Sequence, residues 1–448
     1  MTPIDVEGLM MGKPTFSSSW VLQIGKSIVP HKFVNVFRCV GWCIAVIVTT
    51  VFSQGVGKAQ AVIHPTKENI PTSSDPRFEL SHEIEGADFW HWNSSSISEI
   101  GVDEGDTFQM LGIVFDLETD RERTVYYLDL IHSEVRAYDY EGNWIGNVAN
   151  SGIGPGELQS PVGLLVIPDN SQIVISDQLT HHVFERNEAT FELVSTQRPT
   201  NPSRNGHLCT MNEHYYLVSY EALAKPLRLE TDITQGLPRA IFYRLEEGFA
   251  RGSYEFGSAA SEHKIIQKYT LDGEWVTSFG TPYIYDDPLF PIVFADETLI
   301  ACNSEHNTIA VITNHIPAMT GYSDQGELLW QVTFPDFQSD VVKELVIEGR
   351  VTSRVMFEAG TSVFRSLLSD GEYFYVTYVF REKASRLLQR LRLSESHAFR
   401  VNAHSGLGVY LGAAGPEEGE LLVAMDGEYR FTVTNNSGFP QIRIHSFR

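Results

Sequence analysis

The sequence predicts an all-β protein built as a six-bladed β-propeller, in which small four-stranded sheets stand around a common axis. Three stretches repeat one pattern: an apolar strand that ends in Asp or Asn, a polar turn, and a second apolar strand. They occupy residues 125–142, 172–190 and 298–313, with Asp129, Asp177 and Asn303 at the shared position. A unit of this kind cannot bury its faces alone, so repeated units are expected to pack side by side.

Counting four strands per unit divides the chain into six blades, with seven blades as the alternative. The six units span 108–150, 158–199, 205–280, 288–335, 350–403 and 407 to the C-terminus. Gly-containing turns separate the strands, because Gly supplies the positive φ that tight hairpins need. Large aromatic residues follow several of these turns and are expected to cover the seams between blades: Trp144, Trp275, Trp330, Tyr373 and Tyr429.

The last unit shows no separate outer strand after Phe447. Residues 77–86 alternate like a strand, and we expect them to supply it, so that an N-terminal strand closes the ring and removes open sheet edges. The third unit is interrupted at about 222–263, which we interpret as an insertion between its second and third strands; a seventh blade is the alternative. A short helix is expected at 339–349, capped by Ser339.

The N-terminus has the features of an export signal. Basic residues precede an apolar run at 39–52, which is too short to span a bilayer comfortably, and Ala59-Gln60-Ala61 has the small-x-small form of a cleavage site. We therefore expect a signal peptide at 1–61, with Met10 or Met11 as alternative starts, a linker at 62–76 and one propeller domain at 77–448. An uncleaved membrane anchor is the alternative. The predicted location is periplasmic, cell-surface or extracellular.

Cleavage would leave two cysteines, Cys209 and Cys302, both in apolar strand-like runs. Buried free thiols are the expectation and a bridge between them is the alternative, since geometry has to permit it. The formal net charge of −24 makes nucleic acid and anionic lipid poor partners. No membrane span is expected after cleavage, and the protein is predicted to be a monomer.

The connection before the second unit is the most specific motif. Gly152-Ile153-Gly154-Pro155-Gly156-Glu157 has the form GxGPGE, and Pro161 and Gly163-Leu164 continue it. On these residues and the Asp repeats, the sequence resembles the secreted bacterial six-bladed β-propeller family with NHL-type (TolB-like) repeats, most clearly over 108–200. It departs from that family at His182, where Arg is common, and its later units lack the Asp. The resemblance implies the propeller fold. Some members of this family bind calcium or zinc, but no local motif here matches their ligands.

Several residues are candidates for a ligand-binding face. The glycine-rich loop lacks the Lys-Ser/Thr of a phosphate-binding loop and is expected to shape the crossing between blades. Adjacent histidines on one strand point to opposite faces, so they cannot easily serve one site. An aromatic cluster could stack on sugars or peptides, or pack in a seam. The candidates are Gly154, Pro155, Gly156, Glu157, His181, His182, Trp90 and Trp92.

Metal-binding patterns are weak. Asp116 and Asp120 form an acidic stretch that could hold calcium through oxygen ligands, although solvated loops are the simpler interpretation. Histidines such as His132 and His207 scatter without metal-ligand spacing, but a ring could gather them at its axis. No Gly-x-Ser-x-Gly nucleophile motif occurs.

The loops that join blades share a face with those between the second and third strands, and function usually lies on such loops. The leading hypothesis is an exported, non-catalytic binding module without a cofactor, which holds a peptide, protein or glycan over the axial opening. The alternative is a metal-dependent lyase or hydrolase, with calcium or zinc at the axis.

Overall fold

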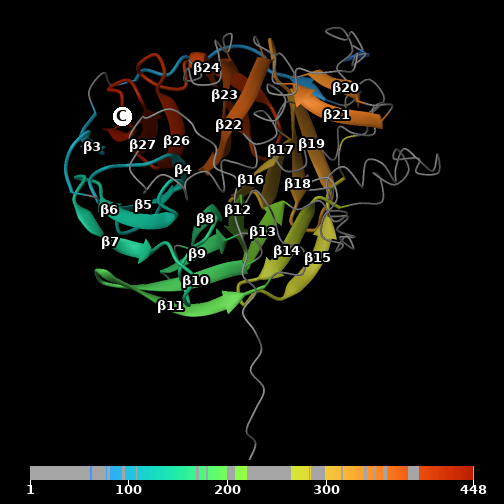
Figure 1. Ribbon diagram of the computed structural model, residues 1–448. Coiled ribbons are helices and arrows are strands. Elements are labelled where there is room, and N and C mark those ends of the chain that lie inside the picture. Colours follow the sequence, from blue (N-terminus) through green and yellow to red (C-terminus); the bar gives the residue numbers. More distant parts are fainter. Residues whose placement is uncertain are drawn as a thin grey trace, which may run out of the picture. The chain divides into compact units, whose positions relative to one another are not determined.

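The structure is a computed structural model that describes most of residues 77–446, together with 61–62. The longest gaps are 219–263, 284–297 and 382–392, and the side chains of 338–361 are not described. Within these limits the chain is all-β, with six small antiparallel sheets arranged in a ring (Figure 1). The six-bladed propeller predicted from the sequence is confirmed. Residues 1–55 lie outside the described residues.

The first three blades follow the chain in order. Blade one contains β4 (Val114–Thr119), β5 (Thr124–Asp129), β6 (Glu134–Asp139) and β7 (Trp144–Ala149). Blade two contains β8 (Pro161–Ile167), β9 (Gln172–Asp177), β10 (Thr180–Asn187) and β11 (Thr190–Gln197). Blade three contains β12 (Leu208–Met211), β13 (His214–Val218), β14 (Ile266–Thr270) and β15 (Trp275–Phe279). The first strand of each blade is the innermost.

The second half repeats the arrangement. Blade four contains β16 (Thr298–Asn303), β17 (Thr308–Thr313), β18 (Ala318–Ser323) and β19 (Leu328–Thr333). Blade five contains β22 (Thr361–Asp370), β23 (Tyr373–Arg381), β24 (Leu393–Asn402) and β25 (Gly408–Gly412). Blade six contains β26 (Leu421–Asp426), β27 (Tyr429–Thr434) and β28 (Gln441–Ser446), and β3 (Ser98–Ile100) is its outer strand.

Two sequence-based boundaries are therefore wrong. Residues 407–413, expected to open the sixth blade, contain β25, the outer strand of blade five. Residues 339–349, expected to be helical, contain β20 (Val341–Ile347), which pairs with β21 (Arg350–Met356) and with β1 (Ala61–Val62) as a small additional sheet. The β-branched residues of Val341-Val342 and Val346-Ile347 favour a strand over a helix.

Apolar side chains fill every seam between neighbouring blades. Separate buried clusters join blades one and two, two and three, three and four, four and five, and five and six. A further cluster joins blade six to blade one, where Phe431 and Ile444 pack with Tyr127 and Val125. Because this last seam is as apolar as the others, the ring is closed by packing as well as by strand pairing.

The ring is closed by an N-terminal strand, but not by the one expected. β3 pairs antiparallel with β28, with Ile100 opposite Ile442. The described part of residues 77–86 lies beside blade four instead, where β2 (His82–Glu83) pairs parallel with β19. The expectation that 77–86 would complete the last blade was therefore wrong. Strand alternation identified a segment that pairs at an outer edge, but alternation does not specify which edge.

The described residues between 77 and 100 form what we call the N-terminal belt, the blue trace that reaches β3 in Figure 1. Arg77 begins it, donating to the carbonyl oxygen of Thr281 over 2.9 Å, beyond the outer strand of blade three. After β2, the backbone N–H groups of Asp88 and Trp90 donate to carbonyl oxygens of Tyr410 and Leu411 on blade five. The belt thus covers the outer edges of blades four and five before completing blade six.

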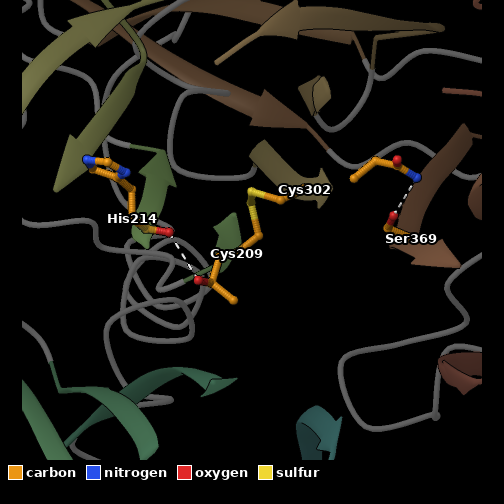
Figure 2. The surroundings of a disulfide bond; sticks show 6 residues. Cys209, His214, Cys302 and Ser369 are labelled. Carbon is orange, nitrogen blue, oxygen red and sulfur yellow. Dashed lines mark hydrogen bonds between the residues drawn. A yellow bond between two sulfur atoms is a disulfide. The ribbon is translucent and has the colours of Figure 1, made fainter. Parts of the chain in front are cut away.

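Cys209 and Cys302 form a disulfide, so the alternative to free thiols is the correct one. Cys209 lies on β12 and Cys302 on β16, the inner strands of blades three and four, with their Cα atoms 5.5 Å apart (Figure 2). The bridge spans 93 residues of sequence and encloses the remaining strands of blade three. The predicted insertion at 222–263 also falls inside this span; it connects β13 to β14 and lies outside the described residues.

The three repeats that predicted the fold are not equivalent in the structure. Asp129 ends β5 and Asp177 ends β9, each the second strand of its blade. Asn303 ends β16, a first strand, so its turn lies on the opposite face of the ring. Successive strands of blades one and four start ten residues apart (114, 124, 134, 144 and 298, 308, 318, 328). A strand–turn–strand pattern with this period fits a blade in more than one register, which explains the misalignment.

The aromatic residues after the turns behave in two ways. Trp330 is buried between blades four and five, where its indole N–H donates to Ala403 over 2.9 Å. It packs so closely on Gly321 that a Cβ there would lie 2.3 Å from the ring. Tyr429 packs against Tyr140 across the closing seam. Trp144 and Trp275 are about half exposed, so the expectation that all five cover seams was wrong.

Ile100 tests the closing strand. We expect Ile100→Ala to lower the free energy of unfolding by about 2–5 kcal/mol, because the side chain is buried between blades six and one. Ile97→Ala is the matched control, since Ile97 precedes the same strand and is 52% exposed. It should change the free energy by less than about 0.5 kcal/mol. Denaturant unfolding measures both, and equal effects would contradict this closure.

Removal of the bridge should destabilise the ring. The double variant Cys209→Ala/Cys302→Ala is expected to lose about 2–4 kcal/mol, because the unfolded chain is freed from a long covalent loop. Unmodified protein unfolded in the presence of a reductant should match the variant. Unfolding curves that do not respond to either treatment would show that the two thiols are not joined.

Candidate binding channel

A cavity lies on the propeller axis, enclosed by inner strands. It has a volume of about 90 Å³. Five of the six blades contribute to its lining, through β4, β12, β16, β22 and β26 or the residues just before them. The lining residues are Val114, Phe115, Asp116, Leu117, Glu118, His207, Leu208, Leu299, Ile300, Arg365, Ser366, Leu367, Leu368 and Val423.

The cavity lies toward the face that carries the connections between blades. Val114 and Phe115 begin β4, Leu208 begins β12, and Leu299 is the second residue of β16. Each of these strands directly follows an inter-blade connection and runs from there toward the opposite face, so its first residues lie near the face with the connections. The turns between second and third strands lie on the same face, which we call the connection face.

Two carboxyl groups enter the cavity from one strand. Asp116 and Glu118 lie two residues apart on β4 and therefore point to the same side. Asp116 accepts a hydrogen bond over 3.0 Å from the backbone N–H of Leu164 on β8 of the next blade. No described residue donates a hydrogen bond to Glu118. Asp116 thus helps join two inner strands, whereas the carboxyl group of Glu118 remains available.

Burial controls the protonation of these groups. It raises the pKa of Asp116, although the charge of His207 and the N–H of Leu164 offset part of the effect. Burial and then the charge of Asp116 raise the pKa of Glu118 well above its usual range. Burial lowers the pKa of His207, partly offset by Asp116. Loss of water thus disfavours the ionised form of each group, and any ligand that supplies opposite charge would favour ionisation.

Aromatic and basic side chains complete the lining. Phe115 is 40% exposed and stacks on His207, with ring centroids 6.4 Å apart. Arg365 is exposed and lies at a bulge in β22, between Phe364 and Ser366. The hydroxyl of Ser366 donates over 3.0 Å to the carbonyl oxygen of Leu422 on the next inner strand. The cavity therefore combines acidic, basic and aromatic groups within a rigid ring of backbone.

The repeat aspartates shape the connection face rather than the cavity. Asp129 is fully buried and accepts from the backbone N–H groups of Gly112 over 2.8 Å and Ile131 over 3.0 Å. Asp177 accepts likewise from Gln159 and Ser160, over 2.9 and 2.7 Å. Each Asp thus ties a turn between second and third strands to the preceding inter-blade connection. Their positions in the repeats follow from this need.

Asp129 also pairs with His132, whose Nδ1 lies 2.8 Å from Oδ2. Burial alone would raise the pKa of Asp129, but hydrogen bonds from His132 and Gly112 outweigh it and lower that pKa. The same hydrogen bond raises the pKa of His132. The pair stabilises the turn, and neither residue is part of the cavity lining.

The GPGE loop is held by its own glutamate. The backbone N–H of Gly154 donates to Glu157 Oε2 over 2.7 Å, and the N–H of Glu157 donates to the carbonyl oxygen of Gly154 over 3.1 Å. A Cβ at Gly152 would lie 1.9 Å from the same carboxylate, so a larger residue there would displace the Glu157 side chain. Gly156 has a positive φ of 76°. Pro155 and Glu157 are exposed on the connection face, and Ile153 beside them is 89% exposed.

The two histidines of β10 point to different seams. His181 is 1% exposed and faces Tyr215 of blade three, with ring centroids 5.7 Å apart. Neither of its ring nitrogens has a hydrogen-bond partner in the described structure. His182 lies on the other side, near Thr196 over 3.3 Å and 4.0 Å from Asp177. The two do not converge on one site.

Trp90 and Trp92 pack in the seam between blades five and six. Trp90 lies 5.5 Å from Tyr375 between ring centroids, and the guanidinium of Arg430 lies 6.0 Å over its ring. Trp92 contacts His445 and donates over 3.2 Å to the carbonyl oxygen of Ala413. The candidate residues thus occupy three separate places, and none of them lines the axial cavity.

Sequence reasoning missed most of the cavity. Asp116 was grouped with Asp120 in an acidic loop, interpreted as solvated with calcium binding as the alternative, but it lies within β4, and Asp120 pairs with Arg186 over 2.7 Å. His207 was noted only as a scattered histidine. Phe115, Glu118 and Arg365 were not identified. The available signal was charge at alternate positions of a first strand, the strand that lies beside the axis of a propeller.

Among the described residues, no three His, Cys, Asp or Glu side chains converge closely enough to hold a metal ion. In the same part of the chain, no helix is long and apolar enough to cross a membrane.

Comparisons with known proteins give only distant structural similarity. No family model and no curated protein matches the sequence. A member of the DUF4221 family from Bacteroides vulgatus is 9% identical, covering 80% of this chain and 98% of its own, with a TM-score of 0.47. A protein of Bacteroides fragilis that is predicted to be exported is also 9% identical, covering 80% and 99%, with a TM-score of 0.43.

The β-propeller domain of a Myceliophteria thermophila protein is 8% identical, covering 79% of this chain and 99% of its own, with a TM-score of 0.37. These values do not support an inference about function. They leave the NHL-type resemblance as a prediction.

His181 gives a pH prediction. Burial, and then the neighbouring charge of His182, lower its pKa to about 4. As the pH falls below about 6.5, the unfolded chain binds a proton before the folded protein does, so stability is lost toward pH 4. His181 alone should contribute about 3 kcal/mol to this loss.

His181→Gln should flatten the dependence of unfolding free energy on pH in this window, as measured by denaturant unfolding. His404→Gln is the control, since His404 is exposed on a turn of blade five. An unchanged slope in His181→Gln would contradict the assignment.

Proposed function

We propose that this protein is an exported binding module that holds a peptide or protein segment over the axial cavity, on the connection face. The observation that carries the proposal is the cavity itself. Side chains from five blades converge there, and all of them except His207 belong to inner strands. Such preorganisation lowers the cost of binding.

A peptide or protein fits this face better than a glycan. Sugar recognition would draw on several exposed aromatic side chains, but Trp90 and Trp92 are packed in a seam and Phe115 is stacked on His207. Among the described residues, the exposed large apolar side chains of the connection face include the aliphatic Val102, Ile113, Ile131 and Ile153 and the aromatic Phe115. Branched aliphatic side chains are suited to apolar side chains of a partner chain.

Export is supported by the disulfide between Cys209 and Cys302. Disulfides persist in oxidising compartments and are rare in the cytosol, apart from catalytic or redox-sensing ones. This bridge joins two inner strands and has a structural position, so it favours a periplasmic, cell-surface or extracellular protein. The apolar N-terminal run at 39–52 points the same way.

The metal-dependent lyase or hydrolase has no specific observation in its favour. Asp116, Glu118 and His207 line one cavity, but they do not form a three-ligand group within the described residues. We therefore favour binding over catalysis.

Ile153 provides the test of the binding face. Peptides selected from a displayed random library on the unmodified protein should bind Ile153→Glu at least about tenfold more weakly, since a charge would replace an exposed apolar contact. Leu407→Glu is the matched control, because Leu407 is 61% exposed on a turn of the opposite face. Titration calorimetry measures both. Equal losses, or a loss only in Leu407→Glu, would place binding elsewhere.

A further inference from the structure

We infer that the axial cavity binds a cationic side chain, Lys or Arg, presented by an otherwise apolar peptide segment. The inference deepens the proposed function and rests on it. In this arrangement the cavity holds the charged side chain of the peptide. The exposed isoleucines of the connection face contact the apolar residues of the peptide on either side of it.

The cavity matches one long side chain in size. One water molecule needs roughly 10–15 Å³ on the measure that gives about 90 Å³ here, so the cavity offers about six to nine water-sized positions. An extended Lys or Arg side chain fills about that many positions. A folded domain or a bulky glycan would not enter and would contact only the rim.

The charges of the lining favour a cation. Asp116 and Glu118 line the same cavity as Arg365 and His207. His207 tends to be neutral because burial lowers its pKa, which leaves two carboxyl groups and one fixed positive charge. One added cation would balance the ionised carboxylates. An anion would meet both of them.

Glu118 gives this assignment a specific partner. Its carboxyl group lines the cavity, yet no described residue donates a hydrogen bond to it or forms an ion pair with it. Glu118 is only partly exposed, and carboxyl groups in such surroundings are usually hydrogen-bonded or paired. A ligand ammonium or guanidinium would supply the missing donor, and Phe115 contributes an exposed aromatic ring to the same lining.

The rim fits the rest of such a segment. Ile113 and Ile131 are held side by side, because the carbonyl oxygen of Ile113 accepts from the N–H of Leu130 over 3.0 Å. Both are nearly half exposed, next to the start of β4, which carries the cavity carboxyl groups. Ile153 projects from the following inter-blade connection. An apolar peptide lying on these residues could place one side chain in the cavity.

The test measures how strongly a cationic peptide and its uncharged counterpart bind to the unmodified protein and to variants that lack carboxyl groups. A library of short random peptides is selected on the unmodified protein, and the best binder is synthesised with its Lys or Arg and with norleucine in that place. We expect enrichment of Lys or Arg and at least about tenfold weaker binding of the norleucine peptide, which is about 1.4 kcal/mol. Glu118→Gln should remove most of that difference, because it removes the charge and keeps the shape.

The control protein is Asp272→Asn/Glu274→Gln, compared with Asp116→Asn/Glu118→Gln. Both lose two carboxylates spaced two residues apart, but Asp272 and Glu274 are exposed on the β14–β15 turn of the opposite face. Only the cavity variant should lose preference for the cationic peptide. Because Glu118 has no partner to lose, Glu118→Gln should fold, which circular dichroism checks.

The outcomes separate the two proposals. Selected peptides without Lys or Arg, whose binding is nevertheless weakened by Ile153→Glu, would overturn the cation assignment and leave the binding face standing. Equal losses in the cavity and control variants would also overturn it, since the effect would then come from net charge alone. No selectable peptide at all would overturn both proposals.

Discussion

The fold depends on apolar burial between neighbouring blades. A four-stranded antiparallel sheet with two apolar faces is stable only when both are covered, and here each face packs against the next sheet in the ring. The last seam, between blades six and one, must be packed with apolar side chains as fully as the others. Ile100, Phe431 and Ile442 fill it with Val125 and Tyr127, so a short N-terminal strand holds the first and last parts of the chain together. The N-terminal belt extends this function by covering the edges of blades four and five.

The sequence was sufficient for the fold class because the pattern is local. Apolar strands of about six residues, polar turns and Gly-containing hairpins recur along the chain, and each is readable without knowledge of its neighbours. What failed were assignments that depend on register. The ten-residue strand spacing let Asn303 be aligned with Asp129, although the two lie on opposite faces. Residues 77–86 and 98–100 are both strand-like, and only tertiary packing decides which pairs with β28.

The candidate site was harder to predict for a related reason. Its residues are single positions on separate first strands, and their proximity follows from ring geometry rather than from any motif. Asp116 and His207 are more than 90 residues apart in sequence, yet they line one cavity. The motifs that were visible, GPGE and the repeat aspartates, shape turns and connections. Charged residues within a predicted inner strand, such as Glu118, would have been the better indication, because burial there costs free energy.

The disulfide has a consequence for the integrity of the chain. Cys209 and Cys302 lie on either side of residues 219–263, so a single cut by a protease anywhere in that stretch leaves two pieces that remain covalently attached. Blades three and four would stay joined through their inner strands even after the backbone is broken. Under denaturing conditions, nicked protein would migrate as one species until a reducing agent separates the two pieces. Insertions or deletions in this stretch would leave the covalent link between blades three and four in place.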